Sequence, residues 1–80
     1  MRTLILASCL VVAGPALAAD DASSCAEGIA MIRDALALNP PESALPKLRK
    51  DLRVAEREQK EGEFDECLDA VGDARKVLGR

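Results

Sequence analysis

Apolar residues recur every three or four positions along most of this chain, which is the period of an amphipathic helix. No segment shows the strict alternation of apolar and polar residues that indicates a half-buried strand. The pattern predicts helices at about residues 24–38, 44–61 and 63–78. Their apolar stripes are Cys25, Ile29, Ile32 and Leu36, then Leu45, Leu48, Leu52 and Ala55, then Phe64, Cys67, Leu68, Val71, Ala74 and Leu78. We therefore expect an all-α fold, a small three-helix up-down-up bundle with short connections.

Capping and breaking residues stand at the ends of these helices. Ser23 or Ser24 can cap the first helix, because a serine oxygen accepts a hydrogen bond from a free amide of the first turn. Asn39-Pro40-Pro41 ends this helix, since prolines remove amide donors and disfavour helical geometry in the preceding residue. Ser43 is the expected cap of the second helix, and Gly62 is expected to end it.

The first 18 residues predict a cleavable secretory signal peptide. A positive charge at Arg2 precedes the apolar run 4–13, and alanines stand three and one positions before the expected cleavage point after Ala18. The run is shorter than the roughly 20 apolar residues that span a bilayer, so no stable membrane insertion is expected after cleavage. The helical domain then comprises residues 19–80, and the compact, alanine-rich signal suggests a bacterial periplasmic or secreted protein.

A second interpretation of the same segment is lipidation. Residues 6–9, Leu-Ala-Ser-Cys, resemble the lipobox of bacterial lipoproteins, in which the cysteine becomes the lipidated first residue. Only a few apolar residues precede Cys9, and processing there leaves an apolar tail at residues 10–19. The ordinary cleaved signal is therefore favoured.

Two cysteines, Cys25 and Cys67, remain after cleavage, in a compartment where thiols tend to be oxidised. In an up-down-up bundle the first and third helices are parallel, and each cysteine falls in a first turn and on an apolar stripe. This predicts a disulfide that stabilises the fold by about 4 kcal/mol, which is comparable with the net stability of a domain of this size. A redox-active pair is the alternative, and the absence of a Cys-x-x-Cys spacing argues against it.

Composition argues against a catalytic role and against a cofactor. The chain has no histidine, tyrosine or tryptophan, and it has no glycine-rich phosphate loop. Glu66, Asp69 and Asp73 share a helix face and could ligate a divalent cation. A solvated outward face is the favoured interpretation, because acidic groups favour the positive end of the helix dipole and no loop has calcium-ligand spacing. We therefore expect no enzyme activity and no metal site.

Charge argues against a nucleic-acid partner. The chain carries 14 acidic and 11 basic residues, for a net charge of -3, which becomes -4 when Arg2 is removed with the signal. Arg49, Arg53 and Arg57 form a basic ridge on the second helix, but three acidic residues of the same helix dilute it. The expected partner of this ridge is the acidic third helix or solvent.

Residues 51–78 resemble a single tetratricopeptide-type helical hairpin. The positions that carry the resemblance are Ala55, Gly62, Phe64, Cys67, Val71 and Ala74. Asp51 and Glu58 stand where such a repeat has aromatic residues, and no second repeat follows at the period of about 34 residues. The resemblance implies peptide or protein binding on a helical surface, without assigning binding residues.

Met31 and Leu38 lie seven residues apart on a flank of the first helix and widen its apolar arc. Either two neighbouring helices bury them, or they form the surface that meets a partner or a second copy. The sequence thus predicts an accessory or adaptor module that acts by protein–protein interaction. The alternative is a periplasmic stress chaperone, similar in size, cysteine count and compartment to the acid-activated chaperones, which would lose tertiary structure at about pH 2 to 3.

Overall fold

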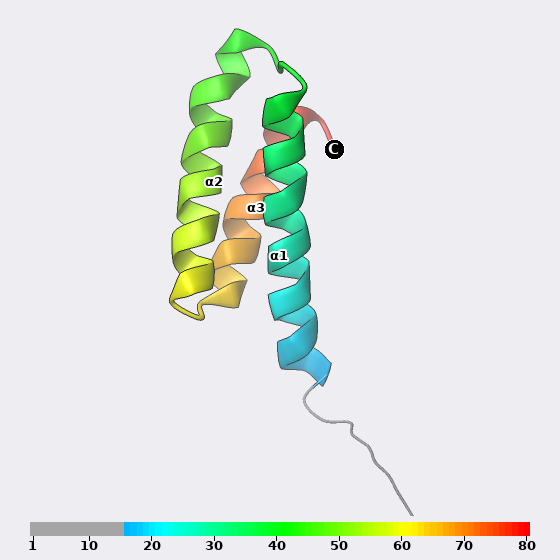
Figure 1. Ribbon diagram of the computed structural model, residues 1–80, viewed down its shortest axis with the longest axis vertical. Coiled ribbons are helices and arrows are strands. Elements are labelled where there is room, and N and C mark those ends of the chain that lie inside the picture. Colours follow the sequence, from blue (N-terminus) through cyan, green and yellow to red (C-terminus); the bar gives the residue numbers. More distant parts are fainter. Residues whose placement is uncertain (1–15) are drawn as a thin grey trace, which may run out of the picture.

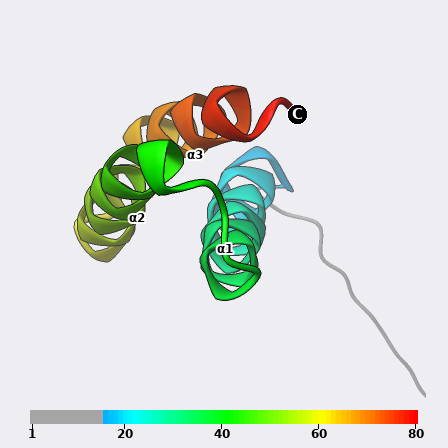
Figure 2. The same ribbon diagram turned by 90° about the horizontal axis from the view of Figure 1, so that it is seen from above.

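The computed structural model of the protein describes the backbone of residues 16–80 and the side chains of residues 20–80. It contains three α-helices and one short 3-10 turn, which are α1 (Ala16–Ala37), η1 (Glu42–Ala44), α2 (Leu45–Lys60) and α3 (Phe64–Leu78). The chain rises through α1, descends through α2 and rises again through α3 (Figure 1), and the three helices surround a common centre when seen from above (Figure 2). Within the described residues every element is helical, which confirms the predicted all-α bundle.

The start of α1 differs from the prediction. The helix begins at Ala16 instead of residue 24, and Ser23 and Ser24 lie inside it with exposed side chains, so neither is its cap. Residues 16–19 read Ala-Leu-Ala-Ala, which are among the strongest helix formers, and a helix begun there continues through the polar residues that follow. Residues 1–15, which hold most of the predicted signal peptide and Cys9, lie outside the described residues.

The start of α2 also differs, because Ser43 does not cap it. Ser43 lies within η1, and the residue at the cap position is Ala44, which makes no side-chain capping hydrogen bond. The backbone performs this role, since the Ala44 amide donates to the Pro41 carbonyl at 2.9 Å and the Leu45 amide donates to the Glu42 carbonyl. Pro46 follows in the first turn, where its lack of an amide proton costs nothing.

A glycine-centred turn ends α2 as predicted. Gly62 adopts a left-handed conformation, with φ at 76°, directly after the last turn of the helix. The Gly62 amide donates to the Gln59 carbonyl at 3.1 Å, and the Glu63 amide donates to the Glu58 carbonyl at 2.8 Å. These bonds satisfy two of the carbonyls that a helix end leaves free and set α3 antiparallel to α2.

The core is aliphatic and narrow. The buried apolar residues are Cys25, Ile29, Ile32, Ala35, Leu48, Ala55, Cys67, Ala70, Val71 and Ala74. Several of the larger stripe residues, Phe64 among them, pack against this core while staying partly exposed. One charged residue, Asp51, is buried with the apolar residues of α2.

Helices α1 and α3 approach each other closely at Gly28. A Cβ atom added to Gly28 would lie 2.5 Å and 2.6 Å from the two γ-methyl groups of Val71. No side chain fits in this space, so the missing side chain of Gly28 allows Val71 to pack directly against the α1 backbone.

Candidate functional site

The two cysteines of the helical domain meet inside the bundle. The Sγ atoms of Cys25 and Cys67 lie 2.07 Å apart, at disulfide distance, and their Cα atoms are 5.8 Å apart. Neither residue has any exposed surface. The predicted pairing of helices α1 and α3 through these residues is therefore present in the structure.

One detail of that prediction is wrong, namely the position of Cys25 within its helix. Cys67 lies in the first turn of α3, but Cys25 lies in the third turn of α1, because α1 begins at Ala16. Cys25 is thus too far from a helix N-terminus for the helix dipole to activate its thiol. Full burial of both cysteines favours a structural cross-link over an exchange-active pair.

The structure separates the two residues of the predicted partner surface. Met31 is partly buried and packs against the core, as expected of a residue between two neighbouring helices. Leu38 is 75% exposed and is the one large hydrophobic residue that is exposed within residues 20–80. The candidate surface therefore centres on Leu38.

Leu38 is held at a well-defined place by the way α1 ends. Its amide donates to the Ala35 carbonyl at 3.2 Å, and Asn39 then turns the chain with a left-handed φ of 56°. Asparagine is one of the few residues that adopt this conformation readily. Residues 37–41, which we call the α1 apex, read Ala-Leu-Asn-Pro-Pro, and all of them are exposed except the half-buried Pro40. The apex presents apolar side chains on a backbone that its two prolines restrict.

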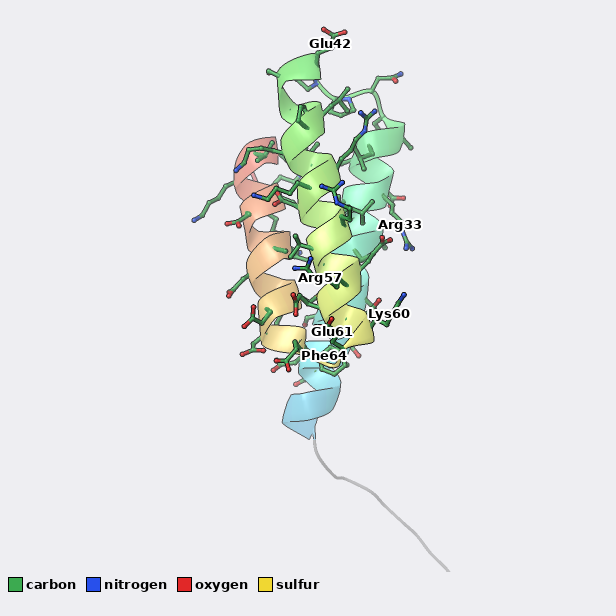
Figure 3. All side chains as sticks on the ribbon, turned by 90° about the vertical axis from the view of Figure 1, so that its left-hand side faces the viewer. Arg33, Glu42, Arg57, Lys60, Glu61 and Phe64 are labelled. Carbon is green, nitrogen blue, oxygen red and sulfur yellow. A yellow bond between two sulfur atoms is a disulfide. The ribbon has the colours of Figure 1, made fainter. Side chains whose placement is uncertain are left out.

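The ion pairs do not join the basic ridge to α3. Arg57 pairs with Glu58 of its own helix at 3.1 Å, and Arg33 of α1 pairs with Glu56 of α2. Both arginines lie on the outer surface of the bundle (Figure 3). No ion pair between α2 and α3 is present in the described part of the chain, so the expected pairing of the ridge with the acidic third helix is not observed.

Asp51 is a residue that sequence reasoning did not place in the interior. It is 6% exposed, and its Oδ2 atom has no hydrogen-bond partner among the described residues. Burial raises the pKa of its carboxyl, the Asp73 carboxylate raises the pKa further, and Lys47 and Lys50 lower it in part. The signal in the sequence is its register, because Asp51 stands three residues after Leu48 and four before Ala55 on one helical face.

Glu66, Asp69 and Asp73 remain exposed on α3. No group of three or more potential metal-ligating side chains is present in the searched part of the chain, and no pocket is found there. Within the same residues, no helix is both long and apolar enough to cross a bilayer.

Comparisons with protein families, with characterised proteins and with solved structures gave no match to this chain. The resemblance of residues 51–78 to a tetratricopeptide hairpin stays a prediction.

Proposed function

We propose that the mature protein is a non-catalytic helical module of the bacterial periplasm that acts by binding a protein, either a different partner or a second copy. The exposure of Leu38 carries this proposal. A leucine gains roughly 1.5 to 3 kcal/mol when it is fully buried, and at the α1 apex this burial is left for a partner to supply.

The construction of the α1 apex supports the proposal. Ordering a flexible loop on binding costs conformational entropy, whereas an apex restricted by Pro40 and Pro41 has less freedom to lose. The buried cross-link between α1 and α3 also holds the helix that carries the apex. The module thus presents a small apolar contact on a preorganised support.

The test is site-specific photo-cross-linking in cells that make the protein. A photo-reactive residue replaces Leu38 in one variant and Arg53, which is exposed on α2, in the matched control. We expect one discrete adduct from position 38 and none from position 53, and the mass of the adduct distinguishes a second copy from another protein. Equal labelling from both positions, or no adduct from position 38, would contradict the proposal.

The acid-activated chaperone remains the alternative from the sequence, and Asp51 weighs against it. An acid-activated chaperone must lose stability when its carboxyl groups are protonated. Protonation of Asp51 has the opposite sign, because its raised pKa means that the folded state binds this proton more tightly than the unfolded state does. Dispersed methyl NMR signals and no binding of a hydrophobic dye at about pH 2.5 would support the binding module, and the reverse would support the chaperone.

A further inference from the structure

The α2–α3 seam, by which we mean the buried surface between these two helices, contains an ionisable group that the proposed function does not use. The inward face of α2 is formed by Leu48, Asp51 and Ala55, all of them buried. Asp51 is 6% exposed, and its Oδ2 atom is buried with no hydrogen-bond partner in the described part of the protein. A buried carboxylate oxygen without a partner loses its hydration and gains nothing in return, which disfavours the charged form.

The charged neighbours of Asp51 come from two helices. Asp73 of α3 acts on it with a like charge, and Lys47 and Lys50 of α2 act with opposite charge. Both lysines are exposed, so water screens their attraction for Asp51. Helix α1 adds no positive charge that would compensate the charge of Asp51. Its buried face consists of apolar residues and Gly28, and its Arg33 pairs with Glu56.

We propose that Asp51 is an acid-responsive carboxyl buried in the α2–α3 seam, near the like charge of the exposed Asp73, such that proton uptake at Asp51 stabilises the folded bundle. A buried carboxylate is costly to ionise, a second negative charge nearby adds to this cost, and Asp51, the buried one of the two residues, therefore takes the proton. The proton removes the desolvation cost of Asp51 and its repulsion from Asp73 in one step. The bundle is thereby strengthened in mild acid instead of opened.

The sign of the effect follows from proton linkage. The folded-state pKa of Asp51 lies above the value of an unfolded chain, about 4, so its destabilising effect is fully present above the folded-state pKa. This destabilisation is relieved as the pH falls through the folded-state pKa, and relief is complete below the unfolded value.

The test compares urea unfolding of four disulfide-intact proteins between pH 7.5 and pH 3.5. These are the wild type, Asp51→Asn, Asp73→Asn and the matched control Asp69→Asn, in which an exposed carboxyl of α3 is replaced. The ratio of each variant's folding equilibrium constant to that of the wild type cancels the background titration of the other groups. We expect Asp51→Asn to fold severalfold more favourably than the wild type at pH 7.5 and to lose this advantage in acid. Asp73→Asn should show a smaller advantage at pH 7.5, and Asp69→Asn should follow the wild type throughout.

Carboxyl-carbon NMR of the wild type gives a reading that does not depend on any variant folding. We expect the Asp51 signal to titrate above the ordinary aspartate value of about 4, and to shift to lower pH in Asp73→Asn. Titration of Asp51 at or below that ordinary value would overturn the proposal. So would an Asp51→Asn variant that is less stable than the wild type at pH 7.5, because the charged carboxylate would then be contributing a favourable interaction.

Discussion

The two seams that α3 makes with its neighbours are built differently. The α1–α3 seam, the buried surface between those two helices, holds the Cys25–Cys67 pair and the close approach of Gly28 to Val71. The α2–α3 seam buries Asp51, a carboxyl group with an unpartnered oxygen. Helix α3 lies beside both α1 and α2 (Figure 2). It therefore packs against a cross-linked apolar surface on the α1 side and against a partly polar surface on the α2 side.

Chain connectivity explains this difference. Helices α2 and α3 are joined by the tight turn at Glu61 to Glu63, so their antiparallel contact is local and closes at little entropic cost. The cysteines that join α1 to α3 are separated by 42 residues, and contacts between those helices must close a much longer loop. The hairpin seam has the lower closure cost and carries the buried carboxyl group, whereas the cross-link and close packing offset the higher closure cost of the seam between distant segments.

The largest expected effect is the loss of the cross-link in the α1–α3 seam. Replacing both cysteines, Cys25→Ala with Cys67→Ala, removes the constraint on a loop of about 40 residues and should lower the free energy of unfolding by about 4 kcal/mol. Urea unfolding followed by far-UV circular dichroism measures the change. The wild type under reducing conditions is the control and should approach the variant once its sulfurs become accessible. A loss below about 1 kcal/mol would show that the α1–α3 seam holds without a covalent link.

The next effect tests the close packing in the same seam. Gly28→Ala places a methyl group where Val71 already lies, and overpacking of this kind costs about 1 to 3 kcal/mol. The matched variant is Gly72→Ala in the interior of α3, where an added Cβ meets nothing within 4 Å. Alanine there should stabilise the helix by roughly 0.5 to 1 kcal/mol. Thermal unfolding of both variants gives the comparison, and changes of the same sign would refute the close approach at Gly28.

These tests depend on features that the sequence predicted to different degrees. The helical period fixed the number of helices, and Gly62 and the Asn39–Pro41 segment marked real helix ends. The pairing of Cys25 with Cys67 followed from topology, because parallel helices bring residues at the same level of the bundle together. Local signals of period and chain reversal were sufficient for this part of the fold.

The remaining features depend on packing, which a single-helix pattern does not determine. The period placed Leu52 on the apolar stripe of α2, but the actual rotation of the helix buries Asp51 more deeply than Leu52. The contact of Gly28 with Val71 depends on the distance between two helices. The different exposure of Met31 and Leu38 depends on how far the neighbouring helices extend along α1. The predicted caps at Ser23, Ser24 and Ser43 were wrong. Helix α1 begins upstream of both serines, and at the start of α2 the backbone carbonyls of Pro41 and Glu42 accept the amide hydrogen bonds.

The smallest expected effect is the coupling between the two seams. Asp73 lies six residues beyond Cys67, about 9 Å along α3, so the acidic groups and the cross-link share no direct partner. The effect of Asp51→Asn should therefore be the same with and without the Cys25→Ala and Cys67→Ala changes, within about 0.5 kcal/mol. Unfolding free energies of the four proteins in this cycle, measured at pH 7.5, give the coupling directly. A coupling above about 1 kcal/mol would contradict this independence. It would mean that loss of the cross-link shifts α3 against α2 and so changes the depth at which Asp51 is buried.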